Sequence, residues 1–312
     1  MRFVESSRLL GSIALLALLV GGSLATSACG GTPAADGAKG GLRGTLYVHG
    51  SPNPTGRTVY KVDFASGAVT SLVSCMLPDE LPDGRILCVD GPDLVTFSPD
   101  GTNRRVIVHT VSVVTTGGVY DAFVSNPRMS PDGRFVAYDD DSLTTPSVYI
   151  VDATSGKPLV QIGNGVDQLF SHPTWGPDGT LYVQGATYSF NLTPGIFKLD
   201  AGFMGIHRID PGLTGPTTPA VSPDGKKIAF IMNHKVWTMN ADGSGARAAT
   251  SPDLEQDFPV WSPDGSVILA STHNCDLVAL DLAGGTFSKV SAQIEGIAGG
   301  FGICPDGQMT WR

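Results

Sequence analysis

Short segments in which apolar and polar residues alternate fill the chain after residue 43. Examples are Arg134–Tyr138, Lys226–Ile231 and Ser266–Ala270, each followed closely by a second segment of the same kind. A period of two predicts strands that bury one face. Gly (40 residues) and Pro (22) are abundant, and charged residues make up only 16%. This composition favours many short strands joined by tight turns, so the pattern predicts an all-β chain.

The tripeptide Pro-Asp-Gly punctuates these segments and recurs seven times. Pro restricts φ to negative values, Asp can bond back to the main chain and Gly accepts a positive φ, so the motif favours a tight turn. From Asp132 onward the copies are spaced by 40 to 46 residues, the size of one four-stranded propeller blade. The aspartates of the seven copies are Asp83, Asp100, Asp132, Asp178, Asp224, Asp264 and Asp306.

Six of the seven copies keep this phase, and we expect each of them to join the first strand of a blade to the second. The exception is Asp100, which follows Asp83 by only 17 residues. It comes directly after a strand-like segment, Asp93–Thr96, that resembles the third strand of a blade. We therefore expect this copy in the hairpin between the third and fourth strands.

The count of units predicts a six-bladed β-propeller of four-stranded antiparallel blades. Three outer strands from residues 44–73 and an inner strand from residues 297–312 are expected to complete one blade, because pairing of the chain ends removes exposed sheet edges. Seven blades are the alternative, since Gln308–Trp311 could form a second strand that competes with Thr45–Val48. The other five blades are expected near residues 75–115, 122–163, 169–210, 215–250 and 255–292.

Two segments, Pro219–Phe230 and Pro259–Gly265, carry the fuller motif Ser-Pro-Asp-Gly and resemble the repeats of the TolB-type six-bladed propeller. The resemblance rests on several copies and implies the same fold for the repeat region. It does not include the separate N-terminal α/β domain of TolB. The same repeat occurs in peptidase propellers and in surface lipoproteins, so the resemblance implies no single activity.

Residues 1–28 have the pattern of a bacterial lipoprotein signal peptide. Arg2 and Arg8 precede an apolar run, and small residues at positions 26–28 lead to Cys29. We expect cleavage before Cys29, a lipid on that cysteine, a flexible tether over residues 29–43 and the propeller over residues 44–312. The protein is thus expected in the bacterial cell envelope, outside the cytoplasm and anchored to the membrane.

The formal net charge of −9 argues against nucleic acid as a partner, and the lipid on Cys29, not a protein face, is expected to contact the membrane. Four further cysteines, Cys75, Cys88, Cys275 and Cys304, form an even set, which in an exported protein suggests disulfides. Of the three possible pairings we favour Cys75–Cys88 and Cys275–Cys304. Four free buried thiols are the alternative.

The candidate ligand-binding residues lie next to the prolines of the predicted inner strands. In a propeller the first strand of each blade lines the central channel, and the loop before it forms one mouth. Hydroxyl, amide, imidazole and carboxylate groups would converge there on a common opening. The alternative is a water-filled channel without a ligand. The candidates are Ser125, Asn126, Arg128, Ser171, His172, Thr217, Thr218, Asp257, Phe258 and Phe301.

The sequence shows no catalytic constellation, because its six histidines lack metal-ligand spacing and no G-x-S-x-G is present. We interpret Asp139–Asp141 as a solvated loop after a second strand, with a calcium site as the alternative, and Trp175 and Trp261 as side chains that fill space between blades. We expect no cofactor, no metal site and a monomer. The predicted function is non-catalytic binding or scaffolding of an envelope protein, peptide or glycan; a propeller hydrolase or lyase working at the channel mouth is the alternative.

Overall fold

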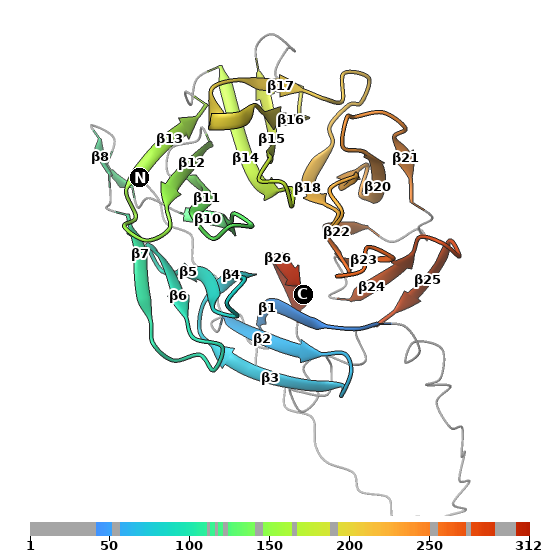
Figure 1. Cartoon of the computed structure of the whole chain (residues 1–312), viewed down its shortest axis with the longest axis horizontal. Coiled ribbons are helices and arrows are strands. Elements are labelled where there is room, and N and C mark those ends of the chain that lie inside the picture. The colour runs from blue at the N-terminus through green and yellow to red at the C-terminus, as the bar shows by residue number, and fades with distance from the viewer. Residues whose placement is uncertain are drawn as a thin grey trace, which may run out of the picture. The chain divides into compact units, whose positions relative to one another are not determined.

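The computed structural model of the chain describes residues 42–51, 57–110, 113–115, 118–120, 124–140, 146–163, 167–187, 193–249, 255–272, 276–290 and 304–312. These residues form six four-stranded antiparallel sheets and one two-stranded sheet. Figure 1 shows the six larger sheets arranged around a common centre. The described part of the chain is a six-bladed β-propeller, as predicted.

The strands of each blade are given from the inner strand A to the outer strand D. Blade 1 contains β26 (Cys304–Trp311), β1 (Thr45–Ser51), β2 (Thr58–Asp63) and β3 (Ala68–Val73). Blade 2 contains β4 (Met76–Glu80), β5 (Ile86–Asp90), β6 (Asp93–Phe97) and β7 (Arg105–His109). Blade 3 contains β10 (Val124–Met129), β11 (Phe135–Asp140), β12 (Ser147–Asp152) and β13 (Pro158–Ile162).

The other three blades have the same order. Blade 4 contains β14 (Gln168–Trp175), β15 (Leu181–Thr187), β16 (Gly195–Leu199) and β17 (Ile206–Arg208), with the short helix η2 (Ala201–Phe203) between the last two. Blade 5 contains β18 (Thr217–Val221), β19 (Lys227–Met232), β20 (Lys235–Asn240) and β21 (Arg247–Ala248). Blade 6 contains β22 (Gln256–Trp261), β23 (Val267–Thr272), β24 (Leu277–Asp281) and β25 (Thr286–Lys289). A hairpin that was not predicted, β8 (Val113–Thr115) with β9 (Gly118–Tyr120), separates blades 2 and 3.

The ring is closed by the two ends of the repeat region. In Figure 1 the red strand β26 lies beside the blue strand β1. The two strands are antiparallel, with Leu46 opposite Trp311 and Val48 opposite Met309. Residues 308–311 therefore continue the inner strand of blade 1 and do not form a second strand, so the seven-blade alternative is wrong.

Five of the Pro-Asp-Gly copies join strands A and B, as predicted. In blade 3 the Asp132 carboxylate accepts hydrogen bonds from the Ser130 hydroxyl at 2.6 Å and the Arg134 N–H at 3.1 Å. These bonds stabilise the charged form and lower the pKa of Asp132. In blade 6 the same pattern, led by the Ser262 hydroxyl, lowers the pKa of Asp264 to about 2. Asp100 lies in the hairpin between β6 and β7, which confirms its separate placement.

The copy at residues 305–307 was wrongly predicted to be a turn between strands A and B. Strand β26 runs through it, and the register with β1 shifts between Val48 and Gly50. The inner strands of the other five blades have a bulge residue with a positive φ at the equivalent position. In β26 this residue is Gly307, with φ 102°. The same tripeptide therefore forms part of a β-bulge in β26 and a tight turn at its other positions.

The core consists of apolar clusters between neighbouring blades, and the tryptophans at the ends of inner strands take part in them. Trp175 packs against the cluster shared by blades 3 and 4, and Trp261 lies in the cluster shared by blades 5 and 6. The Trp175 indole N–H donates to the Arg128 carbonyl at 3.1 Å, and that of Trp261 donates to the Ala220 carbonyl at 2.9 Å. Each indole thus bonds to the inner strand of the preceding blade.

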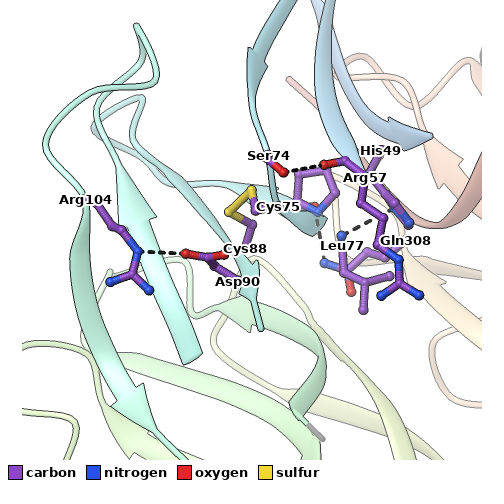
Figure 2. The surroundings of a disulfide bond; sticks show 10 residues. His49, Arg57, Ser74, Cys75, Leu77, Cys88, Asp90, Arg104 and Gln308 are labelled. Carbon is purple, nitrogen blue, oxygen red and sulfur yellow. Dashed lines mark hydrogen bonds and ion pairs between the residues drawn. A yellow bond between two sulfur atoms is a disulfide. The ribbon is translucent and has the colours of Figure 1, made fainter. Parts of the chain in front are cut away.

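Cys75 and Cys88 form a disulfide, which confirms the first predicted pair (Figure 2). Cys75 precedes β4 and Cys88 lies in β5, so the bond joins the loop entering blade 2 to the second strand of that blade. The second predicted pair is untested, because Cys275 and the side chain of Cys304 lie outside the described residues. Residues 1–41, with Cys29, are also outside them. Among the described residues, none belongs to a helix with the length and apolar character that crossing a bilayer requires.

Candidate functional site

Each inner strand contains a β-bulge. In five of them the bulge residue directly precedes a proline, and in β26 Gln308 takes the place of the proline. The register shifts between Ser125 and Arg128 in β10, and equivalent shifts occur in β4, β14, β18 and β22. Proline lacks the N–H that a regular ladder needs, so a bulge is a position where it is tolerated. The residue before the proline has a positive φ of 47° to 52° in all five strands. These residues are Leu77, Asn126, His172, Thr218 and Phe258, with Gly307 at the sixth position.

Four of these bulge residues line one hollow of about 320 Å³ at the entrance of the channel. We call this hollow the D–A mouth, because its walls begin where the D–A loops enter the inner strands. Of the predicted site residues, the structure brings together Asn126, Arg128, His172, Thr218 and Phe258. The other lining residues are Pro173, Pro219, Pro259, Gln308 and Met309.

The residues one position earlier were also predicted, and they do not line the D–A mouth. These residues are still paired with strand B in the regular ladder, and the bulge begins at the residue after each of them. Ser125 and Ser171 instead contact the neighbouring mouth residues: Ser171 Oγ lies 3.2 Å from His172 Nδ1, and Ser125 Oγ lies 3.4 Å from Asn126 Nδ2. The remaining residues of this set are Thr217 and Asp257. Phe301 lies outside the described residues.

Strand-B side chains hold the bulges in place. The Asp139 Oδ2 atom accepts a hydrogen bond from Asn126 Nδ2 at 2.7 Å and another from the backbone N–H of His172, on the next blade, at 2.9 Å. Gln184 Oε1 accepts the N–H of Thr218, again on the next blade, at 2.9 Å. The ring of bulge residues is therefore tied together from blade to blade.

The same link occurs at the closing blade. His49, in β1, accepts the N–H of Leu77 through Nδ1 at 3.3 Å, and Figure 2 shows the two residues side by side with Gln308 near them. The interpretation of Asp139 as part of a solvated loop was wrong, because this residue belongs to β11 and is only 1% exposed. Asp140 ends the same strand, and Asp141 lies outside the described residues. A signal for Asp139 was present in the sequence, since it directly follows the apolar residues of a second strand.

The charge of the D–A mouth comes from Arg128, which lies deeper in the channel. Its Nη1 atom donates to Asp79 Oδ1 at 3.2 Å and to the Met309 carbonyl at 3.3 Å. Burial lowers the pKa of the Arg128 guanidinium, and Asp79 opposes that shift. Burial, with a contribution from the Arg128 charge, lowers the pKa of His172 to about 4. The imidazole of His172 is therefore neutral at pH 7.

The mouth combines the ring surface of two side chains, neutral polar groups and one partly buried cation, Arg128. The ring centroids of His172 and Phe258 lie 6.5 Å apart with an interplanar angle of 26°. Gln308 Nε2 donates to the Pro127 carbonyl at 2.7 Å and closes the floor. This set can bind a side chain through ring contacts and hydrogen bonds. Within the described part of the chain, no group of three or more His, Cys, Asp or Glu side chains is placed to hold a metal ion.

Comparison with known proteins gives a match to a family described as TolB beta propeller domain, over residues 93–310. A protein TolB homolog from Chlorobium chlorochromatii (strain CaD3) is 27% identical over 134 residues, which is 42% of this chain and 26% of that protein. The uncharacterized peptidase YuxL from Bacillus subtilis (strain 168) is 31% identical over 112 residues, which is 32% of this chain and 16% of that protein. The matched regions therefore span only a small part of these relatives.

Two solved structures resemble the described fold. The TolB of Acinetobacter baumannii gives a TM-score of 0.65 at 19% identity, covering 86% of this chain and 66% of that one. The putative TolB of Agrobacterium tumefaciens gives 0.60 at 19% identity, covering 80% and 89%. At such identities the likeness shows a shared fold and nothing more.

Proposed function

The chain belongs to the TolB beta propeller domain family, and we propose that it is a non-catalytic binding or scaffold protein that recognises an envelope protein at the D–A mouth. The likeness to TolB proteins supports a place outside the cytoplasm, in the cell envelope. The signal-like residues 1–28 and Cys29 support a lipid anchor that holds the propeller near a membrane. The segment before residue 42 would then act as the tether.

The observation that carries this proposal is the set of strained side chains at the mouth. Non-glycine residues with φ near 50° cost roughly 1 kcal/mol or more each, and the cost is greatest for β-branched residues such as Thr218. Gly307 shows that glycine fits the same position in the sixth inner strand. Side chains at the other positions are therefore unfavourable for folding, and their clustering around one hollow supports a role in recognition.

The chemistry of the mouth favours a protein segment as the partner. The hollow, whose 320 Å³ includes the open solvent at its entrance, admits only the tip of a side chain. The parallel rings of His172 and Phe258 suit an aromatic or proline side chain, and the Asn126 amide suits a main-chain group. A projecting loop of a folded envelope protein would supply both.

A crosslinking experiment on intact envelopes tests this proposal. The double variant His172→Ala, Phe258→Ala removes both rings, and we expect recovery of the crosslinked partner to fall by about fivefold or more, as for hot-spot residues. The matched control is Leu159→Ala, because Leu159 lies on an outer strand and is 47% exposed. If the double variant folds normally and recovers the partner as well as the control does, the D–A mouth is not the recognition face.

The anchor is tested separately. We expect the chain to sediment with membranes, and Cys29→Ala to release it or to leave its signal peptide uncleaved. Mass spectrometry of the N-terminal peptide is the measurement: an acylated Cys29 supports the anchor, and a mature N-terminus at any other residue contradicts it.

A further inference from the structure

A second hollow lies at the opposite end of the inner strands and is larger than the D–A mouth. It measures about 1160 Å³, including the solvent within it. Its walls are the last residues of the inner strands and the prolines of the Pro-Asp-Gly turns, so we call it the A–B bowl. Exposed turn prolines from four blades surround it: Pro131, Pro177, Pro223 and Pro263.

The wall of the A–B bowl offers apolar ring surface. Trp175 lines this hollow together with the turn prolines of blades 3 and 4 and is partly exposed. Its indole N–H already donates to the Arg128 carbonyl at 3.1 Å. What remains for a ligand is apolar ring surface, which the exposed turn prolines of the same hollow also offer. Ala220, on the inner strand of blade 5, has the smallest side chain of the inner-strand wall.

The floor of the A–B bowl is the guanidinium of Arg128, whose side chain is 21% exposed. Arg128 lines this hollow as well as the D–A mouth. Both of its hydrogen bonds use Nη1, to Asp79 and to the Met309 carbonyl, so Nη2 and Nε have no hydrogen-bond partner among the described residues. Asp79 pairs with Arg128 through Oδ1 alone, because its second oxygen accepts the Met129 N–H at 2.8 Å.

The charge of the A–B bowl also differs from that of the chain. Its charged lining side chains are Arg128, Arg312 and Asp79, whereas the whole chain has a net charge of −9. Arg312 also interacts with Glu80 at the rim, so Arg128 is the cation available to a ligand at the floor. One guanidinium with free donors matches one carboxylate, which can accept two parallel hydrogen bonds from it.

We propose that the A–B bowl binds a small organic carboxylate with an aromatic or other apolar body. The carboxylate would accept hydrogen bonds from the free side of Arg128, and the body would lie against Trp175 and the turn prolines. This site is separate from the D–A mouth, and a ligand in it would reach Arg128 from the opposite side.

Ligand-observed saturation-transfer NMR on the purified protein tests the proposal with four probes. Phenylacetate and indole-3-acetate carry the carboxylate, and phenylacetamide and indole-3-acetamide have nearly the same shape without the charge. We expect both carboxylates to bind about tenfold or more tightly than their amides, because a charge-assisted hydrogen bond is lost. Equal binding of acids and amides, or no binding of either acid at millimolar concentration, overturns the proposal.

Two variants locate the binding. Ala220→Leu places a larger side chain in the A–B bowl, and Arg128→Lys keeps the charge but removes the forked donors; both should weaken phenylacetate binding. The control is Phe258→Ala, which changes the D–A mouth and should leave phenylacetate binding as it is. Thermal unfolding shows whether each variant is folded. Carboxylate binding that survives in a folded Ala220→Leu protein but is lost in Phe258→Ala would place the ligand in the D–A mouth and refute the A–B bowl site.

Discussion

Thr218 combines the features that set the mouth residues apart from ordinary strand residues. It is β-branched, its φ is 47°, and its buried hydroxyl has no hydrogen-bond partner among the described residues. Its backbone N–H is held by Gln184. The backbone contact would survive without the side chain, so the fold needs the bulge at this position but not the threonine.

Replacement of Thr218 by glycine should therefore raise the free energy of unfolding by about 1 kcal/mol, because a positive φ costs glycine little. Urea denaturation measures the change. Ala220→Gly, two residues later where φ is not positive, is the matched control and should lower stability by a similar amount. A loss of stability in both variants would show that the bulge carries no strain.

His172 gives a second prediction at this scale. Its pKa of about 4 lies below the 6.5 of an unfolded histidine. Between these values the unfolded state binds more protons, so the stability that the neutral ring provides is lost as the pH falls from 6.5 towards 4. Burial is the main cause of this shift, and the Arg128 charge adds to it. We expect an NMR titration to give a pKa near 4 that rises in Arg128→Gln; a pKa near 6.5 in the folded protein contradicts this prediction.

At the scale of elements, the turn chemistry was predictable and the bulges were not. Five Pro-Asp-Gly turns and the Asp100 hairpin follow from local φ preferences and strand spacing. The alternation of side chains could not decide whether Ser171 or His172 faces the channel, because a bulge shifts the register by one residue. Pro305-Asp306-Gly307 was misplaced for the same reason: pairing with β1, which is distant in sequence, overrides the local turn preference.

The disulfide also acts at this scale, because it fixes the loop that enters blade 2 just before Leu77. Its cysteines are 13 residues apart and buried between blades 1 and 2. We expect the double variant Cys75→Ala, Cys88→Ala to lose about 3 kcal/mol of stability, the value for a loop of this length. Denaturation with and without reductant measures it. An equal stability for the variant and the oxidised parent contradicts the prediction, and further loss of stability in the variant under reductant would reveal a second disulfide, Cys275–Cys304.

At the scale of the whole molecule, closure of the ring depends on side chains as well as on strand pairing. Gln308, only 3% exposed, extends from β26 and donates through Nε2 to the carbonyls of Pro78 and Pro127. These carbonyls belong to the inner strands of blades 2 and 3. One amide group from the C-terminal strand therefore bonds to two other blades.

Gln308→Glu should weaken this closure in a pH-dependent way. An ionised carboxylate would face the carbonyls of Pro78 and Pro127, so at pH 7 we expect a loss of about 2 to 4 kcal/mol. Burial would raise the pKa of the new carboxyl above its unfolded value. The protonated acid can donate one hydrogen bond, so the lost stability should return as the pH falls from 7 to 5. Gln308→Met is the matched control, since it removes the donor without adding a charge and should show no such recovery. Urea denaturation at both pH values separates the two outcomes, and parallel behaviour of the Glu and Met variants would mean that Gln308 fills space and does not link blades.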